Sequence, residues 1–153
     1  RNGKAELSSN FYDPSAGDGA IADVIRECFP CAYLQVHEIN PTLCAILESK
    51  RHSVFQGDFL QVEPTEWADC ILMNPPFENM ADIDHVMHAY KFLAEGGVLS
   101  SVMSPGPFFR SGAKAEAFRA WLESVGGEVE DLPDGSFLPS GTGVSTKLVT
   151  IQR

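Results

Sequence analysis

Two consecutive prolines separate an apolar segment from an aromatic residue in the sequence Asn74-Pro75-Pro76-Phe77. A proline pair removes two backbone donors and fixes two φ angles, so a central strand cannot continue through it. The preceding run, residues 67–73 (WADCILM), is therefore predicted to be a buried strand that stops rigidly at this point. The amide of Asn74 and the ring of Phe77 would then be held in fixed positions at the end of that strand.

Glycines and a carboxylate follow two earlier apolar segments. Gly17 and Gly19 lie in the loop DPSAGDG, where they permit a tight turn and let a ligand approach the backbone at the start of a helix. Glu38 follows about 20 residues later and can accept hydrogen bonds from both hydroxyls of a ribose. These two features suit a nicotinamide dinucleotide as well as other adenosine-containing ligands.

The charge of the glycine loop favours one class of ligand. Asp13 and Asp18 place negative charge where a pyrophosphate would lie, which favours a ligand with a positively charged amino group. S-adenosylmethionine carries such a group and a sulfonium. Asp58 could then accept a hydrogen bond from the adenine amino group, with Ile39 and Phe59 on either side of the ring.

The elements that must position these residues alternate between strand-like and helix-like segments. Apolar runs predict strands, and apolar residues at positions i, i+3, i+4 and i+7 predict helices, one of them with Asn40 as N-cap and Pro41 at its first position. We expect strands at 10–13, 31–38, 67–73, 97–103, 127–132 and 144–152, a short third strand within 52–60 that ends before Gly57, and helices at 21–28, 41–50, 83–93 and 118–125.

This alternation predicts an α/β fold with a mainly parallel central sheet of about seven strands and helices on both faces. The last two strands have no helix between them and are expected to pair antiparallel. Ligands bind such sheets beyond the carboxyl ends of the strands, where the strand order reverses. With 153 residues the chain is expected to form a single domain, residues 1–153, and its start at Arg1 is compatible with truncation at the N-terminus.

Charge, hydropathy and the spacing of cysteines and histidines argue against several other classes of protein and site. The net charge of −10 argues against a free-standing nucleic-acid binder. No apolar run reaches 18 residues and the first residues lack a signal-peptide pattern, so we expect a cytoplasmic protein without a membrane segment. The single C-x-x-C of Cys28 and Cys31 has no second pair, and His85 and His88 have no third ligand, so no metal site is expected. The two histidines are interpreted as a solvated helix edge.

Four motifs, DPSAGDG, HEIN, GDF and NPPF, follow successive predicted strands. In this order they resemble those of class I S-adenosylmethionine-dependent methyltransferases, specifically the amino-methyltransferases of DNA adenine. The resemblance covers nearly the whole chain, and NPPF is its most specific part. It implies a Rossmann-like fold, S-adenosylmethionine as cofactor and Asn74, Pro75, Pro76 and Phe77 as the catalytic segment. The cofactor contacts that it implies are Asp13, Pro14, Ser15, Gly17, Gly19, Glu38, Ile39, Asp58, Phe59 and Asn74.

The resemblance also implies how the substrate is held. The stretch 135–149 is similar to a late motif of modification subunits in restriction systems, where a phenylalanine lies against the flipped base, and Phe137 matches that position. This suggests a restriction–modification, phage or mobile-element setting. Arg110, in the loop after the fifth strand, is the expected cation on the same side as NPPF. Because no target-recognition domain is visible, we expect DNA recognition to require another domain or subunit.

An exocyclic amino group on a purine is a poor nucleophile because its lone pair is delocalised into the ring. If the Asn74 side-chain oxygen and the Pro75 carbonyl each accept one amino hydrogen, the lone pair turns toward the methyl donor. The prolines fix both acceptors in advance, and Phe77 offers a stacking face. Direct in-line transfer without a covalent intermediate is expected. RNA, a protein glutamine or an idle cofactor-binding role remain alternatives.

Overall fold

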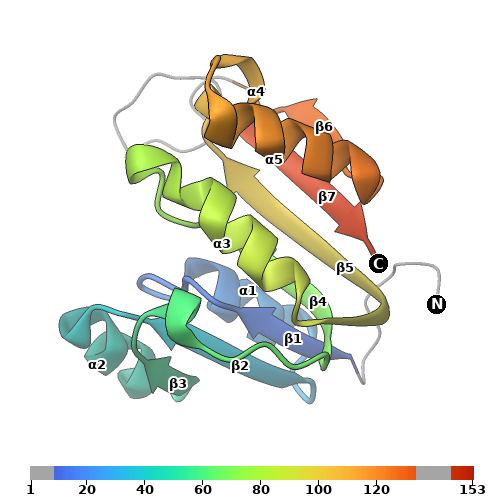
Figure 1. The fold of residues 1–153 in the computed structure, drawn as a ribbon. Coiled ribbons are helices and arrows are strands. Elements are labelled where there is room, and N and C mark those ends of the chain that lie inside the picture. The colour runs from blue at the N-terminus through green and yellow to red at the C-terminus, as the bar shows by residue number, and fades with distance from the viewer. Residues whose placement is uncertain (1–8, 134–145) are drawn as a thin grey trace.

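A computed structural model describes residues 9–133 and 146–153 of the chain (Figure 1). These residues form a seven-stranded sheet with the order β3-β2-β1-β4-β5-β7-β6. Strands β1 to β5 are parallel to one another, whereas β7 runs antiparallel to both of its neighbours, β5 and β6. The prediction of a mainly parallel sheet with an antiparallel last strand is therefore confirmed. The strands are β1 (Asn10–Asp13), β2 (Tyr33–Glu38), β3 (Ser53–Gln56), β4 (Ala68–Met73), β5 (Leu93–Met103), β6 (Glu128–Asp131) and β7 (Lys147–Gln152).

Helices cover both faces of the sheet, as predicted. Phe11 and Tyr12 are neighbours in β1 and point to opposite faces, because side chains alternate along a strand. Phe11 belongs to a cluster with residues of the helices α1 and α2, whereas Tyr12 belongs to a second cluster with residues of α3 and α5. Figure 1 shows α3 and α5 in front of the strands and α1 behind them. The helices are α1 (Ala20–Cys28), α2 (Pro41–Ser49), α3 (Ala81–Tyr90), α4 (Gly106–Phe109) and α5 (Ala113–Ser124), with short 3-10 turns η1 (Phe59–Gln61) and η2 (Glu78–Met80).

Local sequence accounts for the start of α2. The side chain of Asn40 accepts hydrogen bonds from the backbone amides of Thr42 and Leu43, and Pro41 occupies the first helical position. An N-cap of this kind satisfies amides that have no partner within the helix. The predicted start of this helix is confirmed.

The predicted boundary between α3 and β5 is wrong. Leu93 was expected to end the helix, but α3 ends at Tyr90 and Leu93 begins β5 by pairing with Ala68. The register then shifts, so that Cys70 pairs with Val98, and the intervening residues form an irregular stretch. A Cβ at Gly97 would lie 2.9 Å from the carbonyl oxygen of Ala68, so close backbone approach excludes a larger residue there. Pairing with β4 thus decides where the strand begins.

The third strand ends at Gln56, and Asp58 accepts a hydrogen bond from the Leu60 amide and starts η1, so the GDF loop follows this strand as expected. Two other elements differ from expectation. The helix α5 begins at Ala113 rather than at Phe118, and the short helix α4 was not predicted. Among the residues that the structure describes, no helix has the length and apolar character needed to cross a membrane.

The sheet order places β1 beside β4 at the centre, with β2 and β3 on one side and β5 on the other. The strand order therefore reverses between β1 and β4, which is where open α/β sheets bind ligands. The loops that follow β1 and β4 contain the DPSAGDG and NPPF motifs and lie at the same edge of the sheet.

Candidate active site

A hollow of about 350 Å³, called the first hollow below, lies at this edge beside the loops that follow β1, β2, β3 and β4. Its volume is in the range of small-molecule binding sites. The structure therefore brings together residues from all four motifs. The lining residues are Pro14, Ser15, Gly17, Glu38, Ile39, Gly57, Asp58, Phe59, Asn74, Pro76 and His85.

Glu38 is held in place by the loops on either side of it. One carboxylate oxygen accepts a hydrogen bond from the Gly17 amide at 2.9 Å, and the other accepts one from the Asn40 amide at 2.8 Å. Gly17 makes its bond from a left-handed conformation with φ of +59°, which favours glycine. A carboxylate has about four acceptor sites, so Glu38 keeps capacity for two ligand hydroxyls in a fixed orientation.

Asp13 lies beneath the glycine loop, and it is not among the residues that line the first hollow. It is fully buried, and its Oδ1 accepts a hydrogen bond from the Ser15 amide. Among the described residues, neither Asp13 Oδ2 nor the hydroxyl of Ser15 has a hydrogen-bond partner. Burial is the largest cause that raises the pKa of Asp13 to about 7. An unpaired buried carboxylate beside a hollow can accept a ligand donor.

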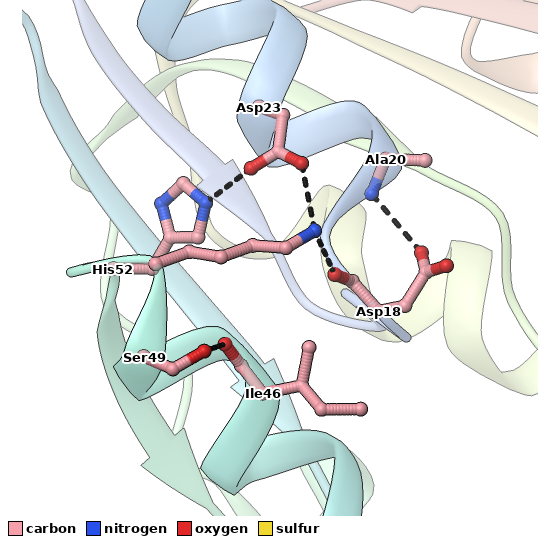
Figure 2. A network of polar contacts seen from close by, with 7 residues as sticks. Asp18, Ala20, Asp23, Ile46, Ser49 and His52 are labelled. Atoms are coloured by element: carbon pink, nitrogen blue, oxygen red, sulfur yellow. Dashed lines mark hydrogen bonds and ion pairs between the residues drawn. The ribbon is translucent and has the colours of Figure 1, made fainter.

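Asp18 and Gly19 do not line the hollow, which corrects two expectations. The carboxylate of Asp18 accepts a hydrogen bond from the Ala20 amide, and its carbonyl accepts one from Lys50 (Figure 2). Gly19 is buried where a Cβ would lie 2.9 Å from Leu47 Cδ2. Close packing of α2 against the start of α1 thus explains this glycine, and Asp18 serves the turn.

A polar network fixes the same two helices to each other on the outer side of the loop. Asp23 accepts hydrogen bonds from Lys50 at 2.8 Å and pairs with His52 at 2.8 Å (Figure 2). These two hydrogen bonds lower the pKa of Asp23. The network joins α1 to the end of α2 and lies outside the first hollow.

The two residues expected to flank an adenine ring, Ile39 and Phe59, differ in how far their side chains are exposed to the first hollow. Ile39 is 64% exposed at the hollow, whereas Phe59 is only 2% exposed. The ring of Phe59 packs edge-on against Tyr12 and His88 in the core. Phe59 therefore offers the hollow only a margin of its ring, which corrects the expectation that its face flanks a ligand. Asp58 is exposed, and one of its oxygens accepts from the Leu60 amide.

His85 was missed by sequence reasoning, and the interpretation of a solvated helix edge is wrong. Its ring lines the first hollow beside Phe59, with ring centres 5.8 Å apart, and its Nδ1 is buried without a partner among the described residues. Burial lowers the pKa of His85. His88 instead contacts the Val62 carbonyl at 2.9 Å. In the sequence, the one indication that His85 belongs to the site was its position in the helix that follows NPPF.

No group of three His, Cys, Asp or Glu side chains among the described residues could hold a metal ion.

The NPPF turn lies between the first hollow and a second one. Asn74 and Pro76 line the first hollow, and Phe77 lines the second. Pro75 is buried. The second hollow has a volume of about 630 Å³. Arg110 also lines it, so the structure brings Arg110 and Phe77 together as expected. Its lining residues are Phe77, Asn79, Met80, Ser104, Pro105, Gly106, Phe109 and Arg110.

The predicted base contact Phe137 lies outside the described residues. Phe109, Met80 and Ser104 were not expected at the site. The dipeptide Phe108-Phe109 could have indicated one inward and one outward ring, but the sequence does not show which is which.

No protein-family model and no curated protein sequence matches this chain. Solved structures do resemble it. A predicted O-methyltransferase, protein Atu636 from Agrobacterium tumefaciens, aligns over 97% of this chain and 75% of its own, with 20% identity and a TM-score of 0.69. TYW2 from P. horikoshii, solved in complex with MeSAdo, aligns over 97% and 58%, with 19% identity and a TM-score of 0.64.

A chain from a structure of a type I restriction–modification system aligns over 95% of this chain and 38% of its own, with 22% identity and a TM-score of 0.75. This chain therefore spans only part of the length of the last two proteins. At such identities the likeness establishes the fold, which is the Rossmann-like fold found in methyltransferases.

Proposed function

We propose that this chain transfers a methyl group from S-adenosylmethionine to an exocyclic amino group, with adenine N6 in DNA as the preferred acceptor. The observation that carries the proposal is the place of the NPPF turn between two hollows. A methyl donor in the first hollow and an acceptor in the second would meet at Asn74.

The first hollow fits S-adenosylmethionine in chemistry as well as in size. Glu38 is oriented to accept from the ribose hydroxyls, and Asp58 can accept from the adenine amino group, beside Ile39. The Oδ2 of Asp13 and the hydroxyl of Ser15, which have no hydrogen-bond partner within residues 9–133 and 146–153, suit the amino-acid end of the ligand. When bound, the cofactor supplies a methyl group on a positively charged sulfur. The neighbouring fold of TYW2 was solved with MeSAdo, which supports an adenosine-containing ligand.

The acceptor side depends on residues of the turn itself. The Asn74 side chain is exposed at the end of β4, where its oxygen can accept one amino hydrogen, and the Pro75 carbonyl would accept the other. Because both prolines restrict the backbone, these acceptors need little reorganisation during transfer. Phe77 is half-buried in the wall of the second hollow and can stack on a flat base.

Adenine in DNA is preferred for two reasons. The NPPF motif resembles that of DNA adenine methyltransferases, and the neighbour with a TM-score of 0.75 belongs to a type I restriction–modification system. This chain spans 38% of that neighbour and carries a net charge of −10. We therefore infer that recognition of duplex DNA uses another domain or subunit, which supplies the phosphate contacts.

Calorimetry with S-adenosylmethionine and NAD, followed by tritium-methyl transfer onto DNA, RNA and protein, tests the proposal. Binding of S-adenosylmethionine alone and label in DNA are expected, with the label recovered as N6-methyladenine after hydrolysis. Preferential binding of NAD would refute the cofactor assignment. Label recovered only in RNA or in a protein glutamine would retain the mechanism and change the substrate, and binding without transfer to any acceptor would indicate an idle module.

A further inference from the structure

One wall of the second hollow is the segment 104–110, and hydrogen bonds from other elements hold both of its ends. The buried side chain of Asp82 accepts two hydrogen bonds from Ser104, one from the amide at 2.9 Å and one from the hydroxyl at 2.7 Å. Arg119 donates to the carbonyls of Pro107 and Arg110 at 2.9 and 3.0 Å. The backbone of this segment is thus held in place before any ligand arrives.

This fastened segment presents one aromatic ring to the core and the next to solvent. Phe108 packs edge-on against Phe118, with ring centres 5.8 Å apart. Phe109 is 70% exposed at the second hollow. An apolar ring held outward on a rigid support offers a stacking surface at little entropic cost to a ligand.

Arg110 lies beside this ring and is available for an anion. Its guanidinium carbon is 5.9 Å from the centre of the Phe109 ring, and a Cβ at Gly106 would lie 3.0 Å from its Nε. Within the described part of the chain its guanidinium forms no ion pair, whereas Lys114 pairs with Asp84. Arg110 is the charged side chain among the residues that line the second hollow. This hollow therefore carries positive charge in a chain whose net charge is −10.

The opposite wall carries two unusual backbone conformations. Asn79 and Met80 follow the NPPF turn with φ of 54° and 56°, in the left-handed region that residues other than glycine seldom adopt. Consecutive residues of this kind are maintained only by the surrounding structure and concentrate at ligand sites. Both line the second hollow.

We propose that the second hollow holds two nucleotides, the target base at Phe77 and, at the segment 104–110, the adjacent nucleotide, with its base stacked on Phe109 and a backbone phosphate bound by Arg110. The inference rests on the proposed function, which places the target base at Phe77. An exposed aromatic ring beside a free guanidinium is the pair of contacts that binds single-stranded nucleic acid without reading its sequence. The acceptor is therefore a nucleotide within an extruded or single-stranded segment, in preference to a free nucleoside or a protein side chain.

The test measures binding of a fluorescein-labelled single-stranded DNA hexamer with one adenine, by anisotropy at several salt concentrations below physiological ionic strength. Phe109→Ala should weaken binding about tenfold or more. Arg110→Gln should lower the slope of log affinity against log salt by about 0.7, the value for one phosphate contact to a single strand. The matched controls Tyr33→Ala, an exposed ring at the start of β2, and Lys91→Gln, an exposed cation after α3, should change neither quantity.

Wild-type affinity and salt slope in both Phe109→Ala and Arg110→Gln would overturn the inference, as would no binding by the wild type at millimolar hexamer. A glutamine-containing peptide that binds more tightly than the hexamer, and loses affinity in Phe109→Ala, would overturn it too. Methyl transfer is measured in parallel. If the hexamer binds through these residues but receives no methyl group, the proposed function fails and the nucleic-acid site stands. If methyl transfer is normal in both variants, the site fails and the proposed function stands.

Discussion

Asp13 should make this protein less stable as the pH rises from about 4 to about 7. The side chain is fully buried, and burial raises its pKa from an ordinary value of 3.8 to about 7. The native state therefore keeps a proton across a range in which the unfolded chain has released it, and stability falls with pH in that window. At about 1.36 kcal/mol for each pKa unit, the full loss at this site is about 4 kcal/mol.

Replacing Asp13 by Asn removes the titrating group while leaving an oxygen for the Ser15 amide. Urea unfolding at pH 4.5, 6 and 8 measures the effect, with Asp18→Asn in the same loop as the control because Asp18 is exposed. The difference in unfolding free energy between Asp13→Asn and the wild type should shift in favour of the variant by about 3 kcal/mol between pH 4.5 and 8, because part of the full loss occurs below pH 4.5. The control should show no such shift.

Bound S-adenosylmethionine should change this pH dependence. A cationic amino group beside Oδ2 would stabilise the carboxylate, so saturating S-adenosylmethionine should reduce the pH-dependent loss in the wild type and not in Asp13→Asn. A wild type and an Asp13→Asn variant with parallel stability curves from pH 4.5 to 8 would refute the argument.

Four further substitutions separate binding, chemistry and packing. Glu38→Ala should weaken S-adenosylmethionine by about 1.5–3 kcal/mol in calorimetry, because it removes charged contacts to the ribose, and unchanged affinity would exclude Glu38 from the site. Asn74→Ala should depress kcat strongly while cofactor affinity stays within a few-fold, and near-normal turnover would defeat the amino-activation mechanism. Phe77→Ala should impair methyl transfer to nucleic acid more than cofactor binding, which equal losses in the two assays would contradict. Gly19→Ala should lower the unfolding free energy by about 1–3 kcal/mol, since the residue has φ of +97° and faces Leu47, and a variant as stable as the wild type would show that the contact relaxes freely.

Local sequence determined the features of this protein that depend on neighbouring residues. The proline pair ends β4 at Met73, Asn40 and Pro41 begin α2, and the alternation of apolar runs with helical spacing yields the mainly parallel sheet. The order of the four motifs along the chain was also sufficient to place their loops at one edge of the sheet, because parallel strands present their carboxyl ends together.

Only the tertiary structure decided which of these loop residues face a ligand. Gly17 and Gly19 are equivalent in sequence, but one lines the hollow and the other packs against Leu47, 28 positions further along the chain. The sequence suggested that His85 is a surface residue, whereas in the fold it lines the first hollow together with the loops after β1 to β4. Phe108 and Phe109 are adjacent rings, and the tertiary structure decides that Phe108 is the one that packs against Phe118. Burial, and with it the pKa of Asp13, is set by atoms from strands and helices distant in the sequence. Such contacts form only when the whole sheet assembles, so no local window of sequence contains them.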